Sequence, residues 1–304
     1  MAQFSMGKSF SHVAPSKAQF VAKGREVMCG GRPLIMGVVN VTDDSFYDGG
    51  RYADSERAIT HAIELVDQGA DILDIGAEST RPGAHPVREE DELARVVPVI
   101  AELARRVTVP ISVDTTKSRV AQSALDAGAS IVNDVSALRG DTAMASVVAR
   151  SGAGVVLMHM QGTPQTMQAA PMYGEVVAEV MQFFNERMQA AMEAGIAQMN
   201  IVLDPGIGFG KLLEHNLELL NRLPELTMLD RPLLVGASRK AFIGQLVGRS
   251  AEHREWGTAA AVALAVDRGA RILRVHDVGI MADVVKVAAA IGAGSPSARQ
   301  AYHA

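Results

Sequence analysis

The stretch ISVDTTKSRVAQSALDAGASIVNDV, residues 111–135, holds one complete strand–helix–strand unit of the predicted fold. It opens on an apolar run and a polar turn. Three apolar residues at helical spacing then precede a glycine that ends the helix, namely Val120, Ala124, Ala127 and Gly128. A second apolar run follows at once, and both runs are nearly continuous rather than alternating, which is typical of parallel strands buried on both faces. The unit therefore predicts a parallel sheet whose strands are joined by helical crossovers.

The same order of elements recurs along the chain. The short apolar runs are Leu34–Val39, Ile72–Ile75, Val109–Val113, Ser130–Val132, Gly154–Met158, Ile201–Leu203, Pro232–Val235 and Arg271–Val275. Eight strand–helix units is the number that closes into a barrel, so we predict a single-domain α/β protein with a (β/α)8 TIM barrel over residues 27–292. A doubly wound open sheet is the alternative, but nothing in the sequence marks a switch in strand order.

Helical spacing fills the intervals between the runs. It predicts helices around residues 59–66, 93–103, 120–127, 141–150, 177–188, 217–223, 259–266 and 284–291, of which 141–150 has the weakest pattern. The sixth of these is expected to stop at Pro224, because proline disfavours continuation of a helix. The charged segment 247–256 is interpreted as a local insertion within the barrel.

The two ends of the chain show no such pattern. Residues 1–26 carry Lys8, Lys17, Lys23 and Arg25 against one acidic residue, and we expect a disordered tail there. Residues 293–304 are expected to form a C-terminal tail. A length of 304 residues nominally suggests two domains at about 150 residues each, but no linker divides the repeating units.

Composition excludes several classes of function. With 29 basic against 34 acidic residues the net charge is −5, which lacks the basic surplus that nucleic-acid binding requires. No apolar run reaches the roughly 18 residues of a membrane span, and no signal-peptide pattern opens the chain, so we expect no membrane partner. Cys29 is the only cysteine, which rules out an intrachain disulfide or a thiolate zinc cluster. These features favour a cytoplasmic protein.

Polar side chains stand at the end of every apolar run. In a barrel these positions converge at the C-terminal end, where active sites of this fold lie. Each one alone is readily explained as a turn or a helix cap, but eight in register predict a polar site. The fourteen polar residues at these eight strand ends are Asn40, Asp74, Glu78, Asp114, Asn133, Asp134, His159, Asp204, Ser238, Arg239, Lys240, Arg274, His276 and Asp277.

The charges of this predicted site separate into two halves. Asp114, Asn133 and Asp204, from three adjacent strands, present oxygens suited to a heterocycle with a row of N–H donors. The predicted cations are Arg81, Lys240, Arg274 and His276, with the last three near strands seven and eight, the usual phosphate corner of this fold. The ligand should therefore carry a donor-rich heterocycle and a phosphate or diphosphate.

Other motifs do not support competing chemistry. The glycines of DPGIGFGK, residues 204–211, fit neither a dinucleotide fingerprint nor a P-loop. No H-E-x-x-H occurs, and Ser238 lies in no nucleophile elbow. His159 is interpreted as a histidine at the rim of the core. Asp43 and Asp44 are consistent either with a hard-cation site or with a solvated turn.

Seven strings closely resemble bacterial dihydropteroate synthases. They are MGVVNVTDDSFYDGG (36–50), DILDIGAESTRPGA (71–84), ISVDTTKSRVA (111–121), IVNDVSA (131–137), LDPGIGFGK (203–211), GASRKAFIG (236–244) and RVHDV (274–278). The resemblance implies a TIM barrel that condenses 6-hydroxymethyl-7,8-dihydropterin diphosphate with 4-aminobenzoate. The products are 7,8-dihydropteroate, an intermediate of folate synthesis, and diphosphate.

The resemblance also implies residue roles. Pterin contacts fall on Asp114, Asn133, Asp204 and Lys240, and diphosphate contacts on Thr80, Arg274 and His276. The neighbourhood of 4-aminobenzoate falls on Thr80, Pro82, Ser238 and Phe209, and Arg81, Met158 and Gly236 complete the substrate-binding set. The implied catalytic residues are Asp114, Asp204, Lys240, Arg274 and His276. Asn40 is the implied ligand of Mg²⁺. A homodimer is usual in the family, and Met281–Ile291 with the preceding helix offers an apolar face for it.

This sequence departs from the family in its first two loops. Asp43 stands where proline is frequent, Tyr47 where serine is usual and Ala77 where glycine is frequent. Without proline the backbone of the first loop is less constrained, so the family's rate of loop closure and its binding of 4-aminobenzoate and sulfonamides do not carry over to this sequence directly. Two alternatives share the pterin edge. One is the pterin domain of methyltetrahydrofolate methyltransferases, and the other is a non-catalytic or drug-insensitive pterin-binding paralogue.

Overall fold

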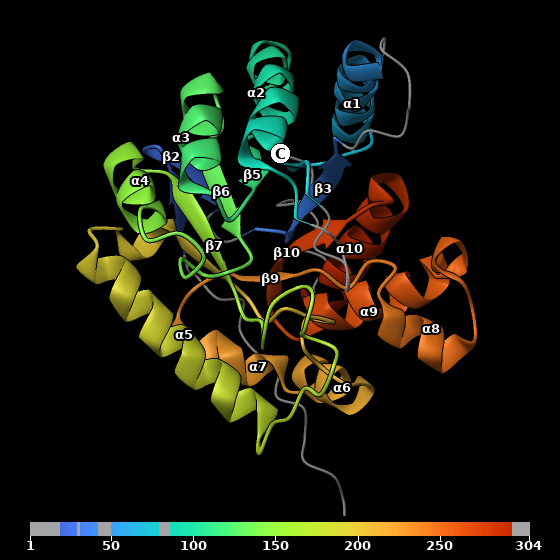
Figure 1. Cartoon of the computed structure of the whole chain (residues 1–304). Coiled ribbons are helices and arrows are strands. Elements are labelled where there is room, and N and C mark those ends of the chain that lie inside the picture. Colours follow the sequence, from blue (N-terminus) through green and yellow to red (C-terminus); the bar gives the residue numbers. More distant parts are fainter. Residues whose placement is uncertain (1–18, 29–30, 42–49, 79–85, 294–304) are drawn as a thin grey trace, which may run out of the picture.

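A computed structural model describes residues 19–28, 31–41, 50–78 and 86–293. Eight parallel strands close into a barrel in the order β10-β3-β4-β5-β6-β7-β8-β9 (Figure 1). Their bounds are β3 Leu34–Asn40, β4 Ile72–Gly76, β5 Ile111–Asp114, β6 Ile131–Asp134, β7 Gly154–Met158, β8 Ile201–Asp204, β9 Leu233–Val235 and β10 Ala270–Val275. The predicted TIM barrel is confirmed, and the strands are buried along almost their whole length, as nearly continuous apolar runs require.

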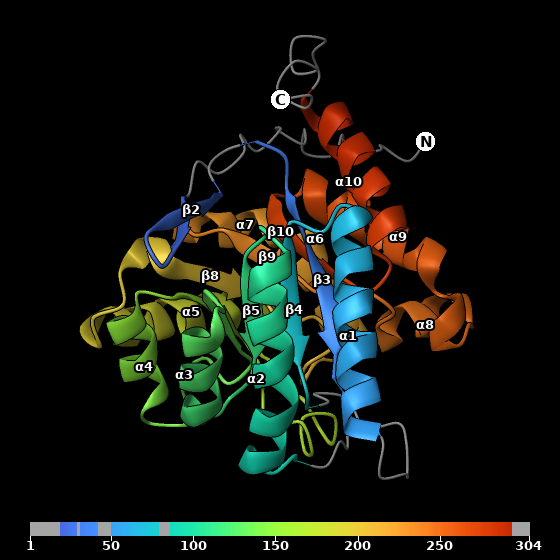
Figure 2. The same cartoon turned by 90° about the horizontal axis from the view of Figure 1, so that it is seen from above.

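Helices surround the barrel, as Figures 1 and 2 show. They are α1 Gly50–Asp67, α2 Glu89–Arg106, α3 Ser118–Ala127, α4 Met144–Ser151, α5 Val176–Glu193, α6 Leu213–Asn221, α7 Leu223–Leu226, α8 Ala241–Val247, α9 Glu255–Asp267 and α10 Val278–Ala293, with short 3₁₀ turns at Gln198–Asn200, Thr227–Leu229 and Ala251–His253. Gly128 ends α3 at a φ of +126°, where an added Cβ would lie 2.5 Å from the Cβ of Ala104. Only glycine fits there without displacing α2.

Two predicted helices need correction. The helix expected to stop at Pro224 already ends at Asn221, and Pro224 lies in the first turn of α7, where proline is tolerated because that N–H has no helical acceptor. The weak helix predicted over 141–150 begins only at Met144. The carboxylate of Asp141 accepts hydrogen bonds from the backbone N–H groups of Ser118 and Ala143, both at 2.9 Å, and so forms the preceding turn.

The prediction of a disordered tail over residues 1–26 is wrong for its last part. An antiparallel hairpin of β1 Phe20–Ala22 and β2 Arg25–Met28 covers the N-terminal end of the barrel. Phe20 is fully buried against the inward-facing side chains of the strands, namely Met36, Ile72, Ile131, Val156, Val202, Leu234 and Ile272. A Cβ at Gly154 would lie 2.6 Å from this ring. Strands of three and four residues are too short to show a periodic pattern, so sequence reasoning missed them.

Candidate active site

One cavity at the C-terminal end of the barrel collects seven of the fourteen predicted polar residues. It is lined by Asp114, Asn133, Val135, Met158, Asp204, Ile207, Phe209, Gly236, Ser238, Lys240, Arg274 and His276. All except Val135 and Ile207 belong to the predicted site. The barrel order also corrects one expectation, because β7 lies between β6 and β8 and the strands of Asn133 and Asp204 are therefore not adjacent. Met158 at the end of β7 supplies an apolar surface between them.

Arg274 forms the centre of a buried charge network across the barrel. Its Nε donates to Oδ2 of Asp74 at 2.6 Å, and its Nη2 donates to Oδ2 of Asp114 at 2.8 Å. The Nδ2 of Asn133 donates to the same oxygen of Asp74 at 3.0 Å. The predicted separation into a carboxylate half and a cationic half is therefore wrong for Arg274, which closure of the barrel places between two acids.

Burial changes the charge expected of the carboxylates. It raises the pKa of Asp114 to about 7, while the charge of Arg274 opposes this shift. Burial likewise raises the pKa of Asp204, although its Oδ1 accepts a hydrogen bond from the N–H of Gly206 at 2.7 Å and Lys240 lies nearby. An apolar environment disfavours the charged form of an acid. The site therefore carries less negative charge near neutral pH than its sequence indicates.

The predicted cations do not all carry a charge. Burial, assisted by Arg274 and Arg239, lowers the pKa of His276 to about 4, so this imidazole is neutral at pH 7. Its Nδ1 lies 3.0 Å from Oγ of Ser238. Lys240 lies with Nζ 3.9 Å from the centroid of the Phe209 ring, a cation–π geometry. Lys240 and Arg274 are thus the charged members of the cationic set that line the cavity.

Contacts from outside the site hold the loop after β9 in place. Arg239 adopts a φ of +59°, and its Nε donates to Oδ2 of Asp277 at 3.0 Å. Its backbone N–H donates at 3.1 Å to the hydroxyl of Thr258, a fully buried residue of α9. Arg254 also donates to the carbonyl oxygens of Arg239 and Lys240 at 3.0 and 3.3 Å. These contacts fix the backbone on both sides of the turn that presents Ser238 and Lys240.

The DPGIGFGK segment is a turn built around a buried lysine. Gly206 has a φ of +65°, and an added Cβ would lie 2.0 Å from the carbonyl oxygen of His159. Lys211 Nζ bonds Nδ1 of His159 at 2.9 Å and the carbonyl oxygens of Phe209 and His159 at 3.0 and 3.3 Å. Burial lowers the pKa of Lys211 to about 7 and that of His159 to about 2. His159 is buried, as expected of a core histidine, whereas sequence reasoning missed Lys211.

Some predicted residues stand apart from this cavity. Six of them lie outside the described residues, namely Thr80, Arg81, Pro82, Asp43, Asp44 and Tyr47. Asn40 is described: it ends β3, its side chain is exposed, and it is not among the residues that line the cavity. Ala77 is buried directly after β4.

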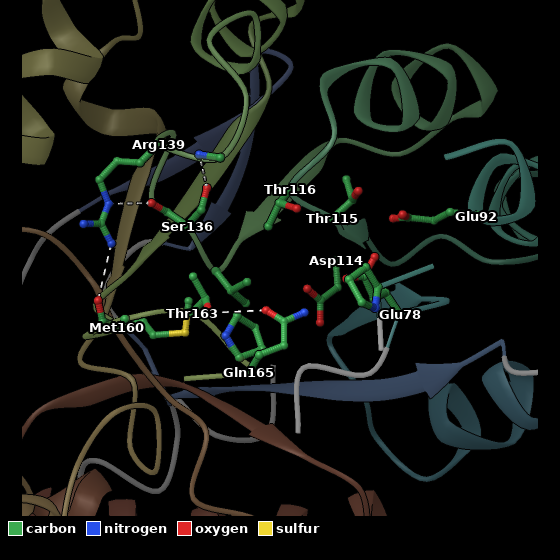
Figure 3. A pocket seen from close by; sticks show the side chains of 15 residues that line it. Glu78, Glu92, Asp114, Thr115, Thr116, Ser136, Arg139, Met160, Thr163 and Gln165 are labelled. Carbon is green, nitrogen blue, oxygen red and sulfur yellow. Dashed lines mark hydrogen bonds between the residues drawn. The ribbon is translucent and has the colours of Figure 1, made fainter. Parts of the chain in front are cut away.

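A second, larger cavity of about 380 Å³ adjoins the first and shares Asp114 and Val135 with it. Figure 3 shows Arg139 on one side of it and Glu92 on the opposite side. Glu92 is fully buried, and its Oε2 accepts from Nζ of Lys117 at 2.5 Å. Asp114 therefore stands on the border between two spaces, one inside the barrel and one under the loops that follow β4 to β7.

Comparisons with known proteins agree with this geometry. A family model described as "Pterin binding enzyme" matches residues 36–276. The dihydropteroate synthase of Synechocystis is 46% identical over 86% of this chain and 91% of its own length, and that of Escherichia coli is 47% identical over 84% and 90%. The Xanthomonas albilineans enzyme in complex with 7,8-dihydropteroate has a TM-score of 0.81 and 45% identity, covering 90% of this chain and 99% of its own.

Fold, cavity and family model together define a pterin-binding enzyme built on a TIM barrel. The relatives narrow this class to one family, since all those compared at 42–49% identity are dihydropteroate synthases. The chain belongs to the dihydropteroate synthase family, whose members are transferases.

Proposed function

We propose that this protein condenses 6-hydroxymethyl-7,8-dihydropterin diphosphate with 4-aminobenzoate, giving 7,8-dihydropteroate and diphosphate in folate synthesis. The observation that carries the proposal is the convergence of Asp114, Asn133, Asp204, Lys240 and Arg274 in one buried cavity. The X. albilineans relative, solved with 4-aminobenzoic acid and with 7,8-dihydropteroate, supports the same pair of ligands here.

The pterin is proposed to lie across the cavity inside the barrel. Asp114, Asn133 and Asp204 offer oxygen acceptors to its N–H edge, and Lys240 offers a donor to its carbonyl oxygen. The side chains of Met158 and Phe209 provide apolar surface for the ring faces. A site that pairs each polar edge of a heterocycle rejects analogues that lack those groups, because its own buried groups would be left unpaired.

The reaction proposed is a dissociative substitution at the pterin methylene. The C–O bond to diphosphate breaks with its electron pair on the diphosphate, and the carboxylates of Asp114 and Asp204 stabilise the electron-poor pterin. The amine of 4-aminobenzoate then forms the C–N bond, and its proton leaves with the diphosphate. Arg274 supplies positive charge and neutral His276 a hydrogen bond to the leaving group. No side-chain nucleophile is needed.

We propose that Mg²⁺ accompanies the diphosphate, with Asn40 as a ligand. Its exposed amide at the end of β3 fits a cation that takes its other ligands from phosphate oxygens and water, as Mg²⁺ commonly does. The part of the chain that the structure describes holds no group of three or more His, Cys, Asp or Glu residues suited to a metal ion. When bound, Mg²⁺ would neutralise charge on the departing diphosphate.

The second substrate, 4-aminobenzoate, is proposed to approach the pterin from the C-terminal end of the barrel. Phe209 and Ser238 line the cavity and would contact 4-aminobenzoate, with Thr80 and Pro82 contributed by the second loop. The Yersinia pestis relative, solved with a sulfonamide drug complex, has 42% identity and a TM-score of 0.85, and covers 90% of this chain and 99% of its own. A sulfonamide that mimics 4-aminobenzoate should therefore compete for this position.

We also propose a homodimer through α9 and α10, which pack side by side. Their outer surface exposes Trp256, Leu264, Ile280, Val287 and Ile291, and Trp256 is 77% exposed. An apolar patch of this kind commonly marks a protein interface. Among the described residues no helix is long and apolar enough to cross a membrane. A cytoplasmic location remains our proposal.

Release of diphosphate tests the proposed function directly. The assay measures diphosphate with both substrates present, with each omitted in turn, and with or without Mg²⁺ and a sulfonamide. We expect release only when both substrates are present, and less of it when the sulfonamide is added. A protein that binds the pterin but releases no diphosphate on addition of 4-aminobenzoate would instead be the non-catalytic paralogue.

A further inference from the structure

Asp74 is a buried acid that bonds two residues of the cavity but that the proposed reaction does not use. It lies within β4, is fully buried, and accepts from both Arg274 and Asn133 through a single oxygen, Oδ2. Its Oδ1 has no hydrogen-bond partner among the described residues. Burying a carboxylate is costly even when it is paired, so stability does not explain an acid at this position.

The first consequence concerns the orientation of Asn133. An asparagine side chain presents an acceptor on one side and donors on the other, and the two orientations have nearly the same shape. Because a carboxylate only accepts, Asp74 fixes Nδ2 of Asn133 toward itself at 3.0 Å. The Oδ1 of Asn133 is then the atom left for the cavity. With Asp114 and Asp204, it completes a set of acceptors that matches a row of N–H donors.

The second consequence concerns Arg274. Its guanidinium bridges two acids, with Nε on Asp74 and Nη2 on Asp114. Among the described residues, Arg274 is the only cation that bonds Asp114, and it also bonds the carboxylate of Asp74. The charged groups that face Asp114 are Arg274 from β10, Asp74 from β4, Glu92 from α2 and Asp134 from β6. The three acids oppose its ionisation, and Arg274 favours it.

We propose that Asp74 is a positioning residue for pterin recognition. It holds Asn133 with its carbonyl oxygen toward the pterin and holds Arg274 in place against Asp114, without touching the substrate itself. The inference rests on the proposed function, since it assumes that a pterin occupies the cavity.

Two substitutions at this position separate its two effects. Asp74→Leu removes the acceptor, and Asp74→Asn keeps an acceptor oxygen but removes the charge. Affinity for 6-hydroxymethyl-7,8-dihydropterin diphosphate is measured by calorimetry without 4-aminobenzoate. Loss of a hydrogen bond to a charged group leads us to expect about tenfold weaker binding, or more, for Asp74→Leu. The matched control is Ser112→Ala, at the buried β5 residue that pairs in register with Asp74; it should bind like the unaltered protein.

A second-site change distinguishes orientation from packing. In Asn133→Asp both side-chain oxygens accept, so no orienting partner is needed and Asp74 becomes a source of repulsion. Asp74→Leu should therefore weaken pterin binding more when residue 133 is asparagine than in the Asn133→Asp protein, where only the contact to Arg274 is lost. A purely structural role for Asp74 predicts equal weakening in both cases, and that result would overturn the proposal.

The pH dependence of binding gives a readout that does not rely on Asp74→Leu folding well. Ionised Asp114 is the form that accepts from the pterin, so affinity falls as pH drops through its pKa of about 7. In Asp74→Asn a like charge is lost, and the acidic limb of binding should move to lower pH. A limb that stays in place or moves to higher pH contradicts the inference. Failure of the unaltered protein to bind the pterin contradicts the proposed function instead.

Discussion

Lys211 allows a sharp test of how burial controls charge in this site. Its side chain is almost fully buried and has no carboxylate partner within hydrogen-bond distance among the described residues. Its bonded partners are Nδ1 of His159 and two carbonyl oxygens. Burial lowers its pKa from 10.5 to about 7. Between these values the unfolded chain holds a proton that the folded protein lacks, so the contribution of Lys211 to the free energy of unfolding rises with pH.

The expected size follows from this proton difference. One proton corresponds to about 1.4 kcal/mol per pH unit, which gives about 2 kcal/mol between about pH 7.5 and about pH 9. Lys211→Met removes the titrating group and therefore this increase. The stability of the unaltered protein relative to Lys211→Met should accordingly grow by about 2 kcal/mol over that interval, whichever protein is the more stable at its start.

Urea unfolding at a series of pH values measures the effect. Lys286→Met is the matched control, since Lys286 is exposed on α10 with Nζ 3.5 Å from Asp283, and its stability should follow that of the unaltered protein. A constant difference between the unaltered protein and Lys211→Met would refute the reasoning. It would mean that the three acceptors around Nζ keep the ammonium charged despite its burial.

Further predictions concern the barrel, the leaving group and the dimer. Phe20→Ala should lower the free energy of unfolding by about 3–5 kcal/mol in urea unfolding, because the fully buried ring fills the end of the barrel, whereas Val27→Ala in the same hairpin should cost far less. Arg274→Ala should reduce the rate of diphosphate release by about 10²-fold or more, and an unchanged rate would contradict its assigned role. Val287→Asp should convert the proposed dimer to a monomer in light scattering; a dimer that persists would place the interface elsewhere.

Much of the fold follows from local patterns. Nearly continuous apolar runs such as Gly154–Met158 predict strands buried on both faces, and the observed β7 has those same bounds. Helix ends are equally local, since Gly128 stops α3 where its positive φ requires glycine. The hairpin around Phe20 was missed because two very short strands depend on the barrel end that they cover, a surface that exists only after folding.

The sequence could predict which residues belong to the candidate site, but not which contacts they make or which of them carry a charge. Asp114, Asn133 and Asp204 were found because each lies in the last two residues of a strand, and strand ends converge in a barrel. The role of Asp74, the burial of Lys211 and the neutral state of His276 could not be found that way. Each depends on which side chains surround one residue in space and on how deeply that residue is buried. Neither property has a local signal in the sequence.

The sequence by itself determined the barrel, the parallel direction of its strands and the set of polar residues at its C-terminal end. These follow from periodicity and from position along a strand, which are properties of neighbouring residues. Only the tertiary structure decided which of them pair and which carry charge. Arg274 meets Asp114 and Asp74 from 160 and 200 positions away along the chain, and closure of the barrel is what brings them within hydrogen-bond distance. Burial then raises the pKa of Asp114, because the free energy of a charge depends on its surroundings.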